Sequence, residues 1–269
     1  MCKIGEVVVV GGVRRSAMIS LSNLSDGRMA HAKSGSWWEN EGQRALANNS
    51  VAYTDKPDME GFMREWLSLV ESKSGERGIF SRVAADKHVE MNGRRETGHE
   101  WGTNPCSEII LRPYQFCNLT EVVVRQGDDL ENLRRKVRLA TILGTAQSTF
   151  TKMPYLRKIW QKNTEEERLL GVSLTGIMDN YLLSKTADSK KWLKELKAQA
   201  IDVNRVYADK LGVPASAAIT CVKPSGTVSQ LTDTASGIHA RHSEYYIRTV
   251  RGDNKDPLTQ FMKDSGIPA

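Results

Sequence analysis

Residues 103–125 read Thr-Asn-Pro-Cys-Ser-Glu-Ile-Ile-Leu-Arg-Pro-Tyr-Gln-Phe-Cys-Asn-Leu-Thr-Glu-Val-Val-Val-Arg, and they hold two of the four cysteines of the chain. Asn104 and Glu108 flank Cys106, and Cys117 opens an apolar run typical of a strand. The proline before Cys106 restricts the backbone that presents the thiol. Polar groups are costly to bury without a purpose, so the role of a small buried hydrophobe fits Cys106 poorly.

A disulfide scaffold and a metal centre both fit the cysteines less well. Four cysteines in 269 residues are too few for such a scaffold, and no Cys-x-x-Cys pair occurs. Cys106 and Cys117 have no histidine at ligand spacing, so we expect no metal site. Cys2 and Cys221 are most simply interpreted as small buried hydrophobes.

Composition indicates a globular protein with an anionic partner. The net charge is +6 and 39% of the residues are hydrophobic, which is enough for a substantial core. A basic chain suits nucleotide phosphates or nucleic acid, but the basic residues are spread along the sequence. There is no apolar run long enough to span a membrane and no secretory pattern, so we expect a cytoplasmic protein.

Alternating elements predict an α/β fold with a mainly parallel sheet in a single domain over residues 1–269. We expect strands at 6–10, 119–125 and 217–222, and a strand or a short buried segment at 17–21. We expect helices at 58–74, from Asp128 or Asp129 to about 150, at 165–183, and at 188–211. The first of these helices is predicted to bury Trp66, and residues 83–102 are predicted to be a loop.

A glycine pair follows the first predicted strand. The loop is Gly11, Gly12, Val13, Arg14, Arg15 and Ser16. Its spacing favours a Gly-Gly hairpin turn with two solvated arginines. The alternative is a mobile loop near phosphates, in which glycine gives backbone freedom and arginine gives charge.

A second turn follows the strand predicted at 217–222. After Lys223 come Pro224, Ser225, Gly226, Thr227, Val228 and Ser229. Backbone N–H groups and hydroxyls of such a turn can converge on an anion, and a helix starting near Val228 would strengthen the site. The turn lacks the ending of a Walker loop, and such clusters are usually ordinary turns. Further on, His239 and His242 lie beside Arg241 and Glu244, but no further His or Cys is close in sequence, so we do not favour a metal site there.

Together these motifs resemble the ribonucleotide reductases, especially the adenosylcobalamin-dependent class II enzymes. The resemblance rests on residues 104–117, on Gly11–Ala17, and on Lys223–Ser229 with Ser236–Arg251, although Ala240 stands where the family usually has proline. It implies part of a ten-stranded α/β barrel with an internal cysteine-bearing finger loop. It also implies ribonucleotide reduction through a thiyl radical.

The resemblance implies roles for individual residues. Cys106 would carry the thiyl radical, Glu108 would act as base toward the ribose 3′-hydroxyl, and Asn104 would orient the sugar. Cys117 would be one member of the reducing dithiol. Pro224–Ser229 would bind substrate phosphates, and Gly11–Ser16 would pass effector identity to the substrate site.

The resemblance also implies partners and an incompleteness. It implies adenosylcobalamin as cofactor, a ribonucleoside di- or triphosphate as substrate, a dNTP or ATP effector, and a thioredoxin-type or other dithiol reductant. The second dithiol cysteine, the first barrel strands and the C-terminal cysteine pair have no match in the chain. We therefore expect a fragment that associates with the missing segments and is inactive alone.

Three alternatives remain open at this point. One is a fragment of a class I catalytic subunit, which a test for a cobalamin requirement would separate from class II. Another is a catalytically inactive nucleotide-binding fragment. The third is a nucleic-acid-binding protein, but the chain has no basic-aromatic platform or helix-turn-helix pattern to support direct binding.

Overall fold

The computed structural model describes residues 1–8, 17–226, 228–247, 249 and 254–268. The chain falls into two compact units, Met1–Val83 with Tyr245–Ala269, and Ala84–Glu244. Helices and parallel strands occur along the chain, which confirms the mixed α/β class. The single domain over residues 1–269 stays a prediction.

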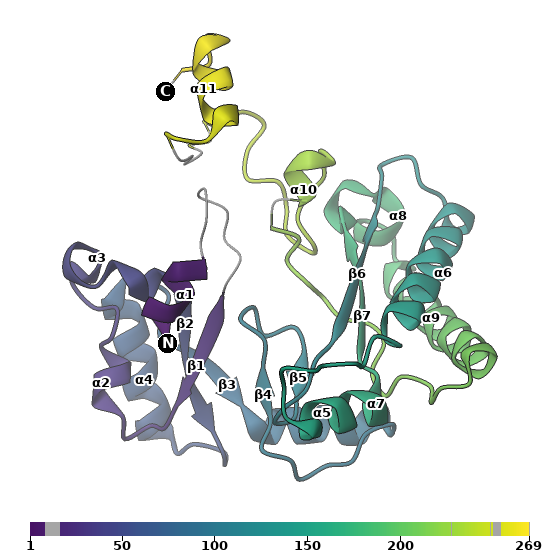
Figure 1. Cartoon of the computed structure of the whole chain (residues 1–269), viewed down its shortest axis with the longest axis horizontal. Coiled ribbons are helices and arrows are strands. Elements are labelled where there is room, and N and C mark those ends of the chain that lie inside the picture. The colour runs from purple at the N-terminus through teal and green to yellow at the C-terminus, as the bar shows by residue number, and fades with distance from the viewer. Residues whose placement is uncertain (9–16, 227, 248, 250–253, 269) are drawn as a thin grey trace. The chain divides into compact units, whose positions relative to one another are not determined.

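A three-stranded parallel sheet organises the first unit (Figure 1). The strands are, in spatial order, β1 (Met18–Ser22), β2 (Ala47–Tyr53) and β3 (Gly78–Ser81). β2 is almost wholly buried because it pairs on both sides. The helices of this unit are α1 (Cys2–Val8), α2 (Gly27–Ala30), α3 (Trp37–Asn40), the 3₁₀ helix η1 (Gly42–Leu46), α4 (Met59–Ser72) and α11 (Pro257–Asp264).

Helix α4 confirms the prediction for residues 58–74, apart from its buried face. The Asp58 carboxylate accepts a hydrogen bond from the Gly61 N–H at 2.7 Å and caps the first turn. Arg77, which directly precedes β3, holds the Glu65 carboxylate of the helix at 2.6 Å, and its own side chain is only 2% exposed. Trp66 is 49% exposed, so its prediction as a core residue is wrong. Its ring stacks on that of Phe62 along the helix surface instead.

Parallel strands also organise the second unit. β6 (Asn118–Val123) pairs with β7 (Leu170–Thr175), and residues 217–221 run along the other edge of β7. The buried strand predicted at 217–222 is reduced to a single bridge between Val172 and Thr220 in the described part of the chain, and Val222 is 56% exposed. β4 (Gly102–Thr103) and β5 (Ile110–Leu111) form a short antiparallel hairpin.

Two long helices cover this sheet, and Figure 1 shows them beside β6 and β7. α6 (Leu130–Gln147) begins at Asp129, whose carboxylate accepts from the Asn132 N–H, and α9 (Ser189–Leu211) ends at Gly212 with φ of 65°. Both helices are confirmed. Their buried side chains, such as Leu133 and Leu196, belong to the same core cluster as Val172 of β7. The remaining helices are α5 (Arg82–Asn92), α7 (Lys158–Glu167), the 3₁₀ helix η2 (Ile177–Asp179), α8 (Tyr181–Ser184) and α10 (Val228–Leu231).

Three predicted elements are wrong, each because neighbours in space decided the structure. Residues 6–8 belong to α1 and not to a strand, and Val7 is 82% exposed, so no pleated surface covers this β-branched run. Residues 82–92 form α5, which buries only Ala85 and Val89, a stripe too narrow to stand out among charged residues. Residues 170–175 form β7 inside the region predicted as helix, because a central parallel strand is buried on both faces and shows no alternation of apolar and polar residues.

Gly171 of β7 is a position where we expect substitution to be costly. A Cβ there would lie 2.3 Å from Cδ2 of Leu119 and 3.0 Å from Sγ of Cys221. Gly171→Ala should therefore lower the free energy of unfolding by about 1–3 kcal/mol, as overpacking does. The measurement is urea unfolding followed by far-UV circular dichroism.

Gly144→Ala in α6 is the matched control, because its Cβ would make ordinary contacts at 3.5 Å with Leu170 and Thr120. Alanine inside a helix should stabilise by about 0.5–1 kcal/mol relative to glycine. Equal effects of the two substitutions would contradict the assigned packing around β7.

Candidate functional site

The turn between β4 and β5 presents Cys106. The Ser107 N–H donates to the Asn104 carbonyl at 2.9 Å, and Ser107 adopts φ of 63°. The Asn104 Oδ1 accepts from the Ile109 N–H at 3.1 Å, which closes the turn from the side chain. Cys106 is exposed at this turn, and its predicted place on an internal finger loop stays a prediction. The Asn104 Nδ2 has no acceptor among the described residues and is left to bind another group.

Glu108, on the same turn, is buried and paired with a lysine. Its side chain is 1% exposed, and its Oε1 accepts a hydrogen bond from Lys223 Nζ at 2.6 Å. Its Oε2 is buried and has no partner among the described residues. Lys223 was not predicted as a site residue, since 115 residues separate the pair. The one available signal was its position at the start of the predicted phosphate turn.

Two further thiols lie within the electrostatic reach of this pair. Burial, together with the Glu108 carboxylate, raises the pKa of Cys117, and Lys223 opposes that rise. Burial, Glu108 and Cys117 raise the pKa of Cys221 to about 12. Burial lowers the pKa of Lys223, but the hydrogen bond to Glu108 outweighs it, so the net shift is upward. The structure thus gathers Cys117 and Cys221 around one charge pair, in which the Glu108 carboxylate is buried and the Lys223 side chain is 31% exposed.

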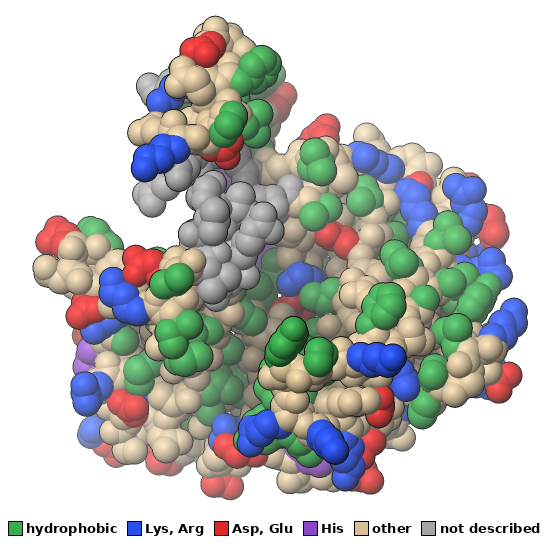
Figure 2. All heavy atoms as spheres, in the orientation of Figure 1, with side chains coloured by type: hydrophobic (Ala, Val, Ile, Leu, Met, Phe, Trp, Pro, Cys, Tyr) green, Lys and Arg blue, Asp and Glu red, His purple; other side chains and the backbone are tan. Residues whose placement is uncertain are grey.

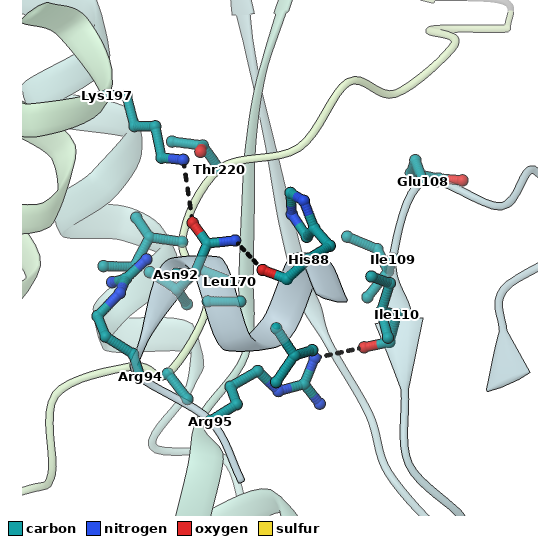
Figure 3. A pocket seen from close by; sticks show the side chains of 14 residues that line it. His88, Asn92, Arg94, Arg95, Glu108, Ile109, Ile110, Leu170, Lys197 and Thr220 are labelled. Carbon is teal, nitrogen blue, oxygen red and sulfur yellow. Dashed lines mark hydrogen bonds between the residues drawn. The ribbon is translucent and has the colours of Figure 1, made fainter. Parts of the chain in front are cut away.

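A cavity of about 580 Å³ lies beside this cluster. Ser107, Glu108 and Cys221 line one part of it, and apolar side chains that include Leu193 and Ile238 line another. A smaller cavity of about 80 Å³ adjoins Glu108 between α5 and residues 217–220. Figure 3 shows its hydrogen bonds, in which Lys197 donates to Asn92, Asn92 donates to the His88 carbonyl, and Arg95 donates to the Ile110 carbonyl.

A buried ion pair stabilises the β4–β5 hairpin, whose turn bears Cys106. Arg95 donates to the Glu167 carboxylate at 2.8 and 3.1 Å and to the Ile110 carbonyl at 2.8 Å. Both side chains are less than one-tenth exposed. Burial raises the pKa of Glu167, but hydrogen bonds from Arg95 and Gln115 outweigh this and hold it below its usual value. This pair links β5 to the end of α7.

The predicted phosphate turn follows directly from Lys223. Ser225 Oγ accepts from the Ser229 N–H at 3.2 Å, and Ser236 Oγ accepts from the Ser225 N–H at 3.1 Å. Gly226 adopts φ of 61°, and α10 begins at Val228, as predicted. Thr227 lies outside the described residues. Several donors of the turn are therefore engaged within the protein itself, and its described residues, 224–226 and 228–229, do not line the larger cavity.

The segment after α10 is fixed to the sheet. The Gly237 N–H donates to Thr175 Oγ1 at 2.9 Å, and a Cβ at Gly237 would lie 2.7 Å from the Lys223 carbonyl. Arg241 binds the Asp179 carboxylate at 3.0 Å. The His239 ring contacts the Ser236 carbonyl, and no group of three metal-ligating side chains is found in the part of the chain that the structure describes.

The predicted effector loop, the surface charge and the membrane prediction concern parts of the chain outside this cluster. The predicted effector loop, Gly11–Ser16, lies outside the described residues. Figure 2 shows Lys and Arg side chains on the visible face interspersed with acidic ones, without a continuous basic stripe. Among the described helices, none has the length and apolar character needed to cross a membrane.

Comparison with known proteins finds reductases. No family model matches the chain. It is 30% identical over 298 residues to the adenosylcobalamin-dependent ribonucleoside-triphosphate reductase of Lactobacillus gasseri and 29% identical over 304 residues to that of Lacticaseibacillus paracasei. Each alignment covers 98% of this chain and 38% of the relative, so the chain spans well under half the length of these proteins.

Solved structures agree in fold. A B12-dependent (class II) ribonucleotide reductase matches 82% of this chain and 34% of its own with a TM-score of 0.63 and 24% identity. The alpha subunit of the Actinobacillus ureae class Id ribonucleotide reductase matches 99% of this chain and 55% of its own with a TM-score of 0.64 and 15% identity. The chain is thus a relative of the ribonucleotide reductases, as its motifs predicted. Within them, its curated relatives are the adenosylcobalamin-dependent ribonucleoside-triphosphate reductases.

Proposed function

We propose that the chain forms part of an enzyme that reduces ribonucleotides to deoxyribonucleotides through a thiyl radical on Cys106. The observation that carries this proposal is the exposed Cys106 on a closed turn next to the buried Glu108. The similarity to adenosylcobalamin-dependent reductases over 98% of the chain supports it. A rigid turn suits this chemistry because the sulfur must reach one particular C–H bond.

The proposed roles follow the reaction. The Cys106 thiyl removes the 3′-hydrogen of the ribose, and Glu108 accepts the proton of the 3′-hydroxyl. The free Asn104 Nδ2 donates to the sugar and orients it. Water leaves from C2′, and Cys117 supplies reducing equivalents together with a second thiol, so that two thiols become a disulfide.

The proposed cofactor is adenosylcobalamin. When bound, it supplies the radical that initiates the chemistry. The exposure of Cys106 fits this group, since the thiol is open to a reactant from outside the turn. Burial raises the pKa values of Cys117 and Cys221, which keeps these two thiols protonated and leaves hydrogen atoms and reducing equivalents available.

Further parts of the proposal concern phosphates, effectors and fold. Residues 224–229 would bind the phosphates of a ribonucleoside di- or triphosphate by exchanging their internal hydrogen bonds for the anion. Gly11–Ser16 would transmit the identity of a dNTP or ATP effector, and a thioredoxin-type or other dithiol reductant would restore Cys117. The sheets would be parts of a ten-stranded barrel, with the β4–β5 turn as its finger loop.

A second candidate is a nucleotide-binding part without turnover. It is favoured by the cysteine count, because Cys2 and Cys221 do not match the second member of the family dithiol. A class I catalytic subunit is a further alternative, since the fold resembles a class Id alpha subunit as well. A cobalamin requirement separates it from the main proposal.

The test is turnover of the purified chain with adenosylcobalamin, a ribonucleoside triphosphate and dithiothreitol, measured as deoxynucleotide. We expect no sustained turnover from the chain alone and turnover after addition of the upstream reductase segment. Sustained turnover by the chain alone would contradict the prediction that it is a fragment that is inactive without the missing segments. Nucleotide binding without turnover under every combination of segments would favour the nucleotide-binding candidate.

A further inference from the structure

The pairing of Glu108 with Lys223 leaves the two carboxylate oxygens in different situations. Oε1 accepts from Lys223 Nζ at 2.6 Å, while Oε2 is buried without a partner among the described residues. A buried acceptor without a donor is costly, so an unpaired oxygen in a candidate active site indicates a missing ligand. A substrate hydroxyl is a donor of the right kind.

Lys223 is itself held in place from the phosphate side of the site. It directly precedes the turn at residues 224–229, and Gly237 approaches its carbonyl so closely that a Cβ would lie 2.7 Å away. The lysine therefore connects the proposed phosphate turn with the carboxylate on the cysteine turn. Among the described residues, Lys223 alone bonds the Glu108 side chain.

We propose that Lys223 is a positioning residue that fixes the Glu108 carboxylate through Oε1 and directs Oε2 to the substrate 3′-hydroxyl. This inference rests on the proposed function, because it uses the sugar as the ligand of Oε2. Lysine suits this task because its ammonium is a compact charge that can hold one oxygen and leave the other free. An arginine would more readily engage both oxygens.

The first test needs no turnover and uses the neighbouring thiols as reporters. The ionisable groups with which Lys223 interacts are Glu108, Cys106, Cys117, Glu121 and Cys221. Iodoacetamide alkylation of Cys117 and Cys221 is measured by peptide mass spectrometry as a function of pH. Lys223→Met should slow alkylation at pH 8 by about three- to tenfold, since one pKa unit is a tenfold change in thiolate population. Glu108→Gln should accelerate it, because the carboxylate raises the pKa of both thiols.

The double variant distinguishes positioning from a simple charge effect. Once Glu108→Gln has removed the carboxylate that holds the lysine, Lys223→Met should change alkylation much less than it does in the wild type. Equal effects in the two backgrounds would overturn the proposal. Lys197→Met is the matched control, because Lys197 also lines the cavity but bonds Asn92, and it should leave alkylation unchanged.

The second test addresses the free oxygen. Calorimetry compares binding of a ribonucleoside triphosphate with its 3′-deoxy analogue. The wild type should prefer the 3′-hydroxyl by about tenfold, and Lys223→Met should lose most of that preference. Lys223→Gln serves if Lys223→Met does not fold, and the same loss is expected.

The outcomes separate the inference from the proposed function. A retained preference in both Lys223 variants would overturn the inference while leaving the proposed function intact. Failure of the wild-type chain to bind either nucleotide would count against the proposed function. In that case the alkylation cycle still decides whether Lys223 positions Glu108.

Discussion

Exchange of Cys106 for serine is expected to reduce deoxynucleotide formation to background, a loss on the order of a thousandfold or more. The O–H bond of serine is too strong to be converted to a radical as a thiol is, so the reaction would have no initiating atom on the turn. The measurement is turnover in the combination of segments that is active with the wild-type residue.

The control for this exchange is Cys2→Ser. Cys2 lies in α1 and contacts the Met18 sulfur at 4.0 Å. It is distant in sequence from the turn that bears Cys106 and belongs to the other compact unit, so activity should be retained. Unfolding of the Cys106→Ser variant should match that of the wild type because residue 106 is exposed. Comparable turnover by Cys106→Ser and the wild type would sink the assignment of the radical position.

Removal of Arg95 should produce the largest loss of stability. Arg95→Met leaves the Glu167 carboxylate buried without its main partner, which costs about 3–5 kcal/mol of unfolding free energy for a buried pair. The measurement is denaturant unfolding at pH 7. Arg205→Met, which breaks a pair whose arginine is 72% exposed, is the control and should have little effect.

The same variant predicts a pH dependence with a defined sign. In the wild type the pKa of Glu167 is held below its usual value. Ionised Glu167 therefore stabilises the folded protein at pH values above the pKa that this carboxyl has in the unfolded chain. This contribution to the free energy of unfolding is lost as the pH falls through the lower pKa of the folded state. In Arg95→Met the Glu167 carboxylate keeps only Gln115 and the more distant Arg112, at 3.8 Å, so protonation relieves the cost of its burial. The difference in stability between the two proteins should therefore shrink from pH 7 toward pH 4, and a difference that grows on acidification would exclude this account.

Local patterns were sufficient for some elements and not for others. The helices α4, α6 and α9 were predictable because aspartates precede them and apolar residues repeat on one face. β7 was not, since its neighbours on both sides come from distant segments and bury it, Ser173 and Thr175 included. Trp66 shows the converse limit, because an apolar stripe on a helix does not say what covers it.

The candidate site divides in the same way. Asn104, Cys106 and Glu108 lie together in the sequence and on one short turn, and their roles stay predictions. The partner of Glu108 and the position of the half-buried Cys221 depend on where residues 217–223 run relative to the cysteine turn, which no local pattern encodes. The preference of Glu108 for Lys223 is a result of the fold.

The brace between Arg95 and Glu167 also bears on the order in which the chain folds. These residues are 72 positions apart, whereas the hairpin that they stabilise pairs residues 102–103 with 110–111. Closing the longer loop costs about 2 kcal/mol more in chain entropy than closing the hairpin. The turn that bears Cys106 can therefore form early, but it becomes rigid only once α7 has docked, so precise geometry around the thiol is a late event in folding.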